Sequence, residues 1–398
     1  MKILYITSRF PYPLEKGDKL RAYNQIKELS KTHEIILYSI TENVIQERWD
    51  QEINRITYYH EISFLKKWQR YANFFRGIFN ALPFQINYFY NKKRKKQIEK
   101  LIVRFQPDLV FCQLIRMSEY IKDSRIPKVL DYMDAFSKGV QRRMENQPFY
   151  IKKLFEVEYR RLLSYEGAIF QHFDAAVIIS NADKELIPVI NNNEIEIIRN
   201  GVNFDYFKPQ PNVIKEYDIV FTGNMSYPPN VSAVLFLHNE VLPLLKVAHP
   251  QIKILIAGAN PSARVKELNA SNFVVTGWVE DINIYYDKSK IFIAPMFIGT
   301  GLQNKLLEAM AMRLPCITSP LVNKSLGAAA QHELLIAETA EEYAHFVIQL
   351  LGNSNFADQV ALDGYNFVTQ NFSWSSTTDQ LNLIFQKITY NTSTYNPS

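Results

Sequence analysis

The sequence is poor in the residues that build disulfide frameworks and metal sites. Its 398 residues include two cysteines, Cys112 and Cys316, each inside an apolar run. The seven histidines are scattered, and neither an HxxxH nor a CxxC spacing occurs. We therefore expect two buried thiols in a reducing compartment, no disulfide, no metal site and no bound cofactor.

Long apolar runs are missing as well. The run in the N-terminal MKILYITSRF is about six residues long, shorter than the roughly 7–15 residues of a signal-peptide core, and no small-residue cleavage site follows it. No stretch approaches the ~18 apolar residues of a membrane-spanning helix. These absences predict a cytoplasmic protein, either free or peripheral on the inner face of the plasma membrane.

Charge is modest overall but unevenly distributed. The formal net charge is +5, yet residues 66–104 hold eleven Lys or Arg residues and one acid, Glu99. Aromatic residues are interleaved with them: Trp68, Phe74, Phe75, Phe79, Phe84, Tyr88, Phe89 and Tyr90. The pattern fits a helical insertion with a solvated basic face and an aromatic core. The pattern is also typical of a segment that binds an anionic membrane surface. Segments that bind single-stranded nucleic acid share it as well, but we do not predict nucleic acid as a partner.

The chain alternates short β-rich runs with helical patterns, in two series. Strands are predicted at residues 2–8, 34–40, 58–64, 108–114, 128–132, 175–180 and 194–199, then at 218–222, 252–257, 273–277, 291–295 and 316–319. Helices are predicted between them, including long ones at 137–170 and 229–245. Such alternation predicts parallel sheets, and two series predict two doubly wound, Rossmann-like α/β domains. We place these domains at residues 1–210 and 211–375. A helical tail at 376–398 would cross back to the first domain and end in disorder from Asn391.

Ligands of doubly wound domains bind beyond the carboxyl ends of the strands. The strand 291–295 is followed by Gly299, Thr300 and Gly301, and then by a predicted helix over residues 302–313. Free backbone N–H groups at such a turn suit a phosphate. Lys305 can add a cation there, and Glu308, one turn further, can accept bonds from two ribose hydroxyls. The alternative is a plain helix with a Lys–Glu surface pair after a glycine turn.

Three further turns follow predicted strands. Gly17 and Asp18, a plausible N-cap, precede a helix over residues 19–30, on the domain face that would lie opposite the donor phosphates. Gly223 and Asn224 could let a diphosphate or a sugar approach the backbone. Trp278 could flank a base whose edge Val279 reads. An ordinary loop at Gly17 and a core tryptophan at Trp278 remain alternatives.

Five segments together resemble the family-four glycosyltransferases of the GT-B fold, and in particular the sugar transferases of bacterial exopolysaccharide gene systems. The resemblance runs from Met1 to about Asn371. Its segments are PYPLEKGDKLR (11–21), LDYMDAFS (130–137), NGVNFDYFKP (200–209), FTGNMSYPPN (221–230) and GTGLQNKLLEAMAMRLP (299–315). The combination of the NGV and GTG-to-LEAMA segments is more specific than either segment alone.

The resemblance implies that the C-terminal domain binds a nucleotide sugar and the N-terminal domain its acceptor. It places the ribose on Glu308, whereas Thr300 stands where relatives carry a glutamate against the donor sugar. The Gly223 segment lacks the usual arginine, so Lys305 would neutralise the diphosphate and Asn224 could donate a hydrogen bond. Asp131 or Asp134 stands where relatives often have a histidine. The implied donor residues are Gly223, Trp278, Val279, Gly299, Thr300, Gly301, Leu302, Gln303, Asn304 and Glu308, the catalytic residues are Lys305, Asp134 and Asn224, and the acceptor-side residues are Gly17, Asp18 and Lys19.

The implied activity is a retaining, metal-independent transfer of a sugar from a nucleotide-diphosphate donor of the UDP or GDP type. The acceptor would be a polysaccharide or a lipid-linked sugar. Charge on the leaving diphosphate would be stabilised by backbone N–H groups of residues 301–303, the helix dipole and Lys305. No enzymatic nucleophile is needed, in keeping with the lack of a clear Ser–His or paired-carboxylate arrangement. The alternatives are a non-catalytic sugar-nucleotide-binding partner in a polysaccharide assembly complex, an epimerase on the same fold and a nucleic-acid-binding protein.

Overall fold

The computed structural model describes the chain except residues 15, 146–147, 190–193, 299–301 and 396–398, and except the side chains of 67, 70, 142, 145, 150, 182 and 391–395. The chain forms two compact units. Unit 1 comprises Met1–Arg199 and Thr377–Ser398, and unit 2 comprises Asn200–Ser376. The structure thus divides the chain at 199/200 and 376/377, whereas the sequence placed the divisions at 210/211 and 375/376.

Unit 1 is built on a seven-stranded sheet in the order β3-β2-β1-β4-β5-β6-β7, in which every strand pair is parallel. The strands are β1 Lys2–Thr7, β2 Glu34–Thr41, β3 Tyr59–Phe64, β4 Leu109–Gln113, β5 Lys128–Met133, β6 Ala175–Ile178 and β7 Ile195–Ile197. The helices are α1 Gly17–Leu29, α2 Glu47–Asn54, α3 Lys67–Ile78, α4 Phe84–Phe89, α5 Lys92–Phe105, α6 Phe136–Glu145, α7 Phe149–Ile169 and α8 Asn181–Lys184, with the 3-10 helices η1 Ile115–Tyr120 and η2 Phe170–His172.

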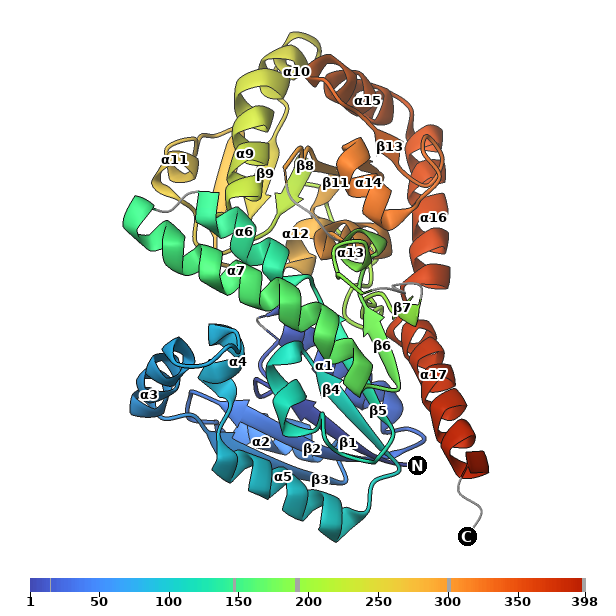
Figure 1. The fold of residues 1–398 in the computed structure, drawn as a ribbon. Helices are drawn as coiled ribbons and strands as arrows, with labels where there is room; N and C mark the ends of the chain where they lie inside the picture. The colour runs from blue at the N-terminus through green and yellow to red at the C-terminus, as the bar shows by residue number, and fades with distance from the viewer. Residues whose placement is uncertain (15, 146–147, 190–193, 299–301, 396–398) are drawn as a thin grey trace. The chain divides into compact units, whose positions relative to one another are not determined.

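Both faces of this sheet are covered, as alternating strand residues require (Figure 1). One face packs on α1, on Ile53 of α2 and on α17, the C-terminal helix Trp374–Tyr395. The other face packs on α4, α5, η1 and α7. Cys112 is fully buried in this second core, and Cys316 is buried in unit 2, so the prediction of two buried free thiols is confirmed.

The long helix predicted over residues 137–170 is wrong in one respect, because the structure has two helices there, α6 and α7. Pro148 stands immediately before α7, with an extended ψ of 150°. A proline inside a continuous helix would remove a hydrogen bond and clash with the preceding turn, so one helix cannot run through it.

Unit 2 is built on a second all-parallel sheet in the order β10-β9-β8-β11-β12-β13. Its strands are β8 Tyr217–Thr222, β9 Ile254–Ala257, β10 Phe273–Gly277, β11 Ser289–Ala294, β12 Cys316–Thr318 and β13 Leu335–Ile336. Its helices are α9 Pro228–Phe236, a π-helical turn Leu237–Val241, α10 Leu242–Ala248, α11 Ala263–Lys266, α12 Asn283–Asp287, α13 Asn304–Ala311, α14 Pro320–Leu326, α15 Ala340–Gly352 and α16 Ser354–Asn371. The two-residue strand β13 was not anticipated from the sequence.

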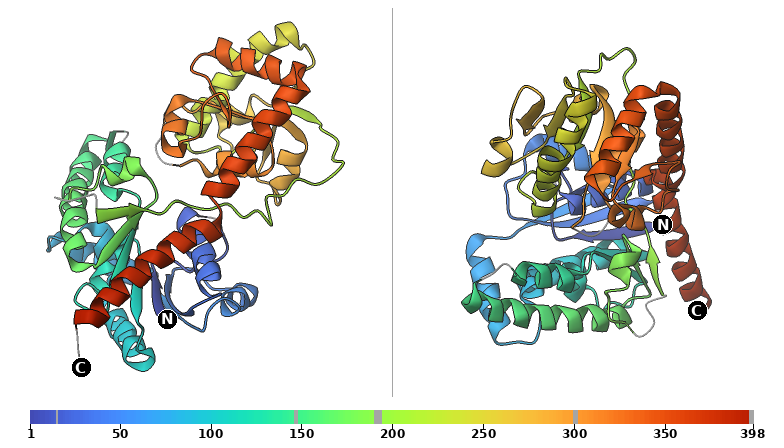
Figure 2. Two further views of the ribbon diagram at one scale, coloured as in Figure 1. Left: turned by 90° about the vertical axis from the view of Figure 1, so that its right-hand side faces the viewer. Right: turned by 90° about the horizontal axis from the view of Figure 1, so that it is seen from above.

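The C-terminal helix α17 begins in unit 2 and packs against unit 1 over most of its length (Figures 1 and 2). Leu381, Ile384 and Phe385 are buried in the core of unit 1, and the ring of Phe385 lies 5.5 Å from that of Phe111 on β4. The predicted return of the C-terminal helix to the first domain is therefore confirmed. The helix continues through Tyr395, beyond Asn391, where the sequence had placed disorder.

One helical stretch, Pro228–Ala248, is long and apolar enough to cross a membrane by length and composition alone, which the sequence analysis had not anticipated. Val234, Leu237 and Val241 of this stretch are fully buried in the core of unit 2. Buried core helices also meet these criteria of length and composition, so they do not show that this helix crosses a membrane.

Candidate functional site

Unit 2 contains a cavity of about 430 Å³ beyond the carboxyl ends of β8, β9 and β10. This is where a doubly wound sheet binds its ligand, and the volume is within the roughly 300–1,000 Å³ of small-molecule sites. Every described donor residue predicted from the sequence lines it: Gly223, Trp278, Val279, Leu302, Gln303, Asn304 and Glu308. Gly299, Thr300 and Gly301 lie outside the described residues.

Lys305 and Glu308 project into the cavity from the first turns of α13. Both side chains are partly buried, so the alternative of a solvated Lys–Glu surface pair is wrong. The helix begins at Asn304, two residues later than predicted, and Gln303 is its N-cap residue. The free N–H groups of the helix start therefore belong to residues slightly further along the chain than the sequence suggested.

Lys305 is held by neutral groups. Its ammonium group donates a hydrogen bond to Oδ1 of Asn230 and lies 4.6 Å from the ring centre of Phe221. Burial lowers the pKa of Lys305 to about 7, and the nearby Glu308 opposes that shift. A cation with so little compensating charge is poised to interact with an anion entering the cavity.

Glu308 is oriented by Tyr286, which is fully buried on α12. The Tyr286 hydroxyl donates to Oε2 of Glu308 at 3.0 Å and lies 2.8 Å from the hydroxyl of Thr222. Burial raises the pKa of Glu308 to about 6, although the bond from Tyr286 and the charge of Lys305 lower it. The carboxylate is thereby fixed in one direction while its second oxygen remains able to accept bonds.

Two glycines let neighbouring groups approach the backbone closely at the cavity floor. Gly223 has φ of 149°, and a Cβ there would come within 2.7 Å of the Asn230 amide nitrogen and 3.4 Å of the Lys305 ammonium. Gly258 has φ of 146°, and a Cβ there would lie 1.8 Å from the carbonyl oxygen of Gly223. Only glycine suits either position.

The sequence analysis missed Gly258 and Asn230 as site residues. Gly258 carried a signal, because it directly follows the predicted strand 252–257, as the other turn glycines follow theirs. Asn230 ends the FTGNMSYPPN segment, but no local pattern pointed to a contact with Lys305, which it reaches from helix α9 only through the tertiary fold.

Trp278 and Asn224 differ in how they relate to the cavity. Trp278 lines it and is 72% exposed, so the alternative of a core tryptophan is wrong. Asn224 does not line it, and its Oδ1 accepts bonds from the backbone N–H and the hydroxyl of Ser226. The predicted catalytic role of Asn224 therefore has no support in the described geometry.

The acceptor-side residues lie in unit 1. Helix α1 begins at Gly17, so Asp18 is in its first turn and is not the N-cap, which is Lys16. The Asp18 carboxylate pairs with Arg9 at 2.6 Å. Lys19 lines a cavity of about 240 Å³ together with Lys16 and Trp49.

Two aspartates, Asp131 within β5 and Asp134 immediately after it, have different environments. Asp131 is fully buried and pairs with Arg21 at 2.6 Å, so it is structural and inaccessible to a substrate. Asp134 keeps solvent access, but desolvation near the end of β5 and the charges of Asp183 and Asp131 raise its pKa to about 6.

The basic, aromatic segment 66–104 forms α3, α4 and α5. Phe89 is buried, as expected for an aromatic core, but Trp68, Tyr71 and Phe75 on α3 are 65%, 67% and 60% exposed. Their spacing of three and four residues places them on one side of the helix. The segment therefore has both an aromatic interior and an exposed aromatic stripe.

The part of the chain that contains this site is similar to a known family. Residues 216–353 match the family model described as glycosyl transferases group 1. An uncharacterized 44.6 kDa protein in the cps region of Klebsiella pneumoniae is 24% identical over 393 residues, covering 93% of this chain and 96% of the relative.

Solved structures share the whole architecture. The Anabaena protein HepE, in complex with UDP and glucose, has a TM-score of 0.68 at 12% identity, covering 97% of this chain and 99% of its own. Sucrose-phosphate synthase from Thermosynechococcus elongatus has a TM-score of 0.67 at 12% identity, covering 97% and 98%. Residues 216–353 are thus similar to the group 1 glycosyl transferases, and the chain as a whole shares the two-domain GT-B fold of these structures.

Proposed function

We propose that this protein is a glycosyltransferase that transfers a sugar from a nucleotide-diphosphate donor of the UDP or GDP type to a polysaccharide or lipid-linked acceptor, with retention of configuration and without a metal. The observation that carries the donor assignment is the pairing of Lys305 and Glu308 in one cavity of unit 2. The relative from a cps region and the structural neighbour bound to UDP support the same assignment.

Each cavity residue suits one part of such a donor. The ammonium of Lys305 would face the diphosphate, whose oxygens carry the negative charge. The oriented carboxylate of Glu308 would accept bonds from the ribose hydroxyls, and Trp278 would stack on the base.

The chemistry follows from this placement. As the bond between the sugar and the diphosphate breaks, negative charge grows on the leaving group, and Lys305 stabilises it more strongly than it stabilises the bound substrate. The acceptor hydroxyl would attack from the same face and pass its proton to the leaving phosphate. A protein nucleophile is then unnecessary, and the positive charge that a metal could supply comes from Lys305.

A thermal-shift screen against UDP, GDP, ADP and CMP and their sugar conjugates tests the donor site, because ligand binding to the native state raises apparent stability. We expect a shift with one nucleotide diphosphate that Glu308→Ala removes. Glu267→Ala, an exposed glutamate on the surface near α11, is the matched control and should keep the shift. No shift with any nucleotide would refute the assignment.

Retention and metal independence have their own measurements. The anomeric configuration of the product, read by NMR, should equal that of the donor. Turnover should survive removal of divalent cations by a chelator. An inverted product, or activity that requires an added divalent ion, would refute that part of the mechanism.

The segment 66–104 would hold the enzyme at an anionic membrane surface on the cytoplasmic side. Its exposed stripe and its exposed lysines, among them Lys92, Lys93 and Lys96, combine the apolar and cationic groups that such a surface attracts. Flotation with anionic liposomes at low salt should carry the protein upward, and replacing Trp68 and Phe75 with serine should abolish it. A protein that stays at the bottom of the gradient excludes this role.

A further inference from the structure

Unit 1 contains a second cavity, of about 510 Å³, at the point where the strand order of its sheet reverses. Arg9 follows β1, Glu42 follows β2 and Arg116 follows β4, and all three line this cavity. Doubly wound sheets bind ligands at such a reversal, outside the carboxyl ends of the strands. The position therefore indicates a ligand site in unit 1.

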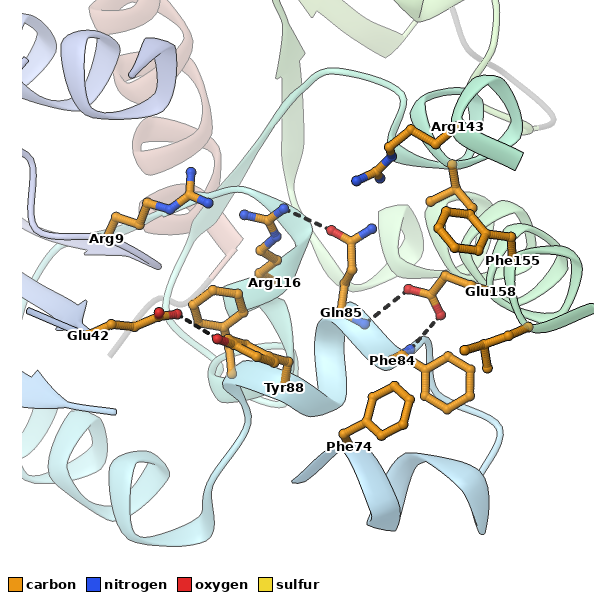
Figure 3. Close-up of a pocket in the computed structure, with 13 residues that line it drawn as sticks. Arg9, Glu42, Phe74, Phe84, Gln85, Tyr88, Arg116, Arg143, Phe155 and Glu158 are labelled. Atoms are coloured by element: carbon orange, nitrogen blue, oxygen red, sulfur yellow. Dashed lines mark hydrogen bonds between the residues drawn. The ribbon is translucent and has the colours of Figure 1, made fainter. Parts of the chain in front are cut away.

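The cavity is amphipathic (Figure 3). The guanidinium groups of Arg9, Arg116 and Arg143 lie along one side, and the rings of Phe74 and Phe84 lie on the other. The remaining apolar lining residues are Phe89, Val140, Leu154 and Phe155. A ligand that fits must carry an apolar chain attached to a polar end.

Two of the arginines have carboxylates in their surroundings but are not bound to them. Asp18 and Asp134 act on Arg116 through their charge, and Glu158 interacts in the same way with Arg143. Arg116 donates to Oε1 of Gln85 at 2.8 Å, its Nε is buried without a hydrogen-bond partner among the described residues, and its guanidinium lies 4.6 Å from the ring centre of Phe136. The Nε of Arg143 donates to the carbonyl oxygen of Gly139. Neither arginine forms an ion pair with a described residue, whereas Arg9 is paired with Asp18.

The carboxylates in the lining are engaged elsewhere. Glu158 accepts the backbone N–H groups of Phe84 and Gln85 at 2.6 and 3.0 Å, and Glu42 accepts the hydroxyl of Tyr88 at 2.8 Å. Burial lowers the pKa of Arg116 to about 10, and the like charges of Arg9 and Arg143 lower it further. Cations held together in this way favour the binding of an anion between them.

We propose that this cavity binds a single-chain lipid phosphate, with the phosphate between Arg116 and Arg143 and the chain against Phe74, Phe84 and Leu154. Given the proposed transferase function, on which this reading rests, the bound molecule is the carrier end of a lipid-linked sugar acceptor. Arg9 and Glu42 also line the neighbouring cavity of about 240 Å³ that contains Lys19 and Trp49, so a sugar attached to the phosphate would extend there.

The surrounding surface is suited to delivering such a molecule. Phe74 lines the cavity from the same helix, α3, whose exposed stripe contains Trp68, Tyr71 and Phe75. Leu154 lines the cavity from α7 and is itself 42% exposed. Apolar side chains thus continue from the cavity to the surface, which gives a lipid chain a path out of a membrane.

The test is binding of farnesyl phosphate to the full chain, measured by calorimetry at concentrations at which the probe does not aggregate. Farnesol and inorganic phosphate serve as half-ligands. We expect saturable binding of farnesyl phosphate, with affinity at least about tenfold above that of either half-ligand, because each lacks one of the two interactions. Equal affinity for farnesol and farnesyl phosphate would overturn the assignment of the arginines.

Matched variants locate the site. Arg143→Glu should weaken farnesyl phosphate about tenfold or more, whereas Lys153→Glu, an equal charge change at an exposed position on α7 outside the lining, should not. Leu154→Asp should weaken it as well, whereas Val157→Asp, at a side chain also 42% exposed but outside the lining, should not. If the lining variant and its control both lose affinity for farnesyl phosphate, or if neither does, the proposal is overturned.

A nucleotide titration separates this inference from the proposed function. Each variant should keep the nucleotide-dependent thermal shift of unit 2, which also shows that it is folded. A wild-type chain that binds a nucleotide diphosphate but no farnesyl phosphate refutes the lipid site alone. A chain that binds farnesyl phosphate but no nucleotide refutes the donor assignment and leaves the lipid site standing without its role as acceptor site.

Discussion

The affinity of the unit 2 cavity for a nucleotide sugar should fall steeply as pH rises above 7. Burial lowers the pKa of Lys305 to about 7 in the free protein. A diphosphate brought against this side chain favours its charged form, so binding is coupled to uptake of a proton. Above pH 7 the free protein must first protonate Lys305, and this cost weakens the apparent affinity.

The magnitude follows from the fraction of protonated Lys305. With a pKa of about 7, that fraction falls about 25-fold between about pH 6.5 and about pH 8.5. Glu308, whose pKa is about 6, becomes somewhat more ionised over the same interval, which favours ribose binding by less than about twofold. The net expectation is a loss of affinity of about 20-fold.

The assay is calorimetric titration with a UDP-sugar or GDP-sugar, chosen by the thermal-shift screen. A sugar conjugate is required because the terminal phosphate of a free nucleotide diphosphate titrates near pH 6 and would confuse the profile. Lys305→Arg keeps its charge throughout and should flatten the profile. Lys266→Met, at an exposed lysine on α11, should leave it unchanged. A flat wild-type profile, or a slope that persists in Lys305→Arg, would refute the reasoning.

Four further predictions concern stability, turnover and nucleotide binding. Lys305→Met should raise the free energy of unfolding, measured by chemical denaturation, by about 1–2 kcal/mol near pH 7. A lysine whose pKa is lowered by folding destabilises the fold fully below its folded pKa of about 7 and progressively less up to its unfolded pKa, so the gain should shrink toward about pH 10. Equal stability of the variant and the wild type at pH 7 would contradict this prediction. The turnover rate of Lys305→Met should fall as expected for a rise of about 2–4 kcal/mol in the activation free energy, which is the typical effect of removing one hydrogen-bond donor to a developing anion. A near-normal rate would exclude the catalytic role of Lys305. Asp131→Asn should destabilise unit 1 by about 3 kcal/mol, since it leaves a buried arginine charge uncompensated. Asp18→Asn should cost less than about 1 kcal/mol, because the side chain of its partner Arg9 is 36% exposed and water can solvate the charge that is left. Similar losses in both variants would contradict this difference between the two arginines. Gly223→Ala should weaken nucleotide binding while unit 1 stays folded, because its Cβ meets Asn230 and approaches Lys305, and unaltered binding would show that the cavity floor adapts.

The two α/β units can be predicted from the amino-acid sequence without the structure. Apolar runs of four to seven residues, separated by helical patterns, identify parallel strands because each strand is buried on both faces and each crossover needs a helix. Glycine-containing turns at the ends of the predicted strands also pointed to four site residues. These residues, Gly223, Trp278, Lys305 and Glu308, line one cavity. Pro148 was also present in the sequence, and its effect on the long helix was overlooked.

How these residues act together depends on contacts between elements that are far apart in the sequence. Lys305 contacts Asn230 and Phe221, which belong to other elements, and Glu308 accepts a hydrogen bond from Tyr286 on α12. Desolvation depends on every group packed around a charge, and such groups are distant in sequence.

The same reason separates the two aspartates of the LDYMDAFS segment. They stand three residues apart, and nothing local distinguishes them. The fold buries Asp131 against Arg21, 110 residues earlier in the chain, and leaves Asp134 open to solvent. Likewise, the sequence revealed a basic, aromatic segment, but only the folded helices show that Phe74 faces a cavity lined by arginines while Phe75, its neighbour in the chain, faces solvent.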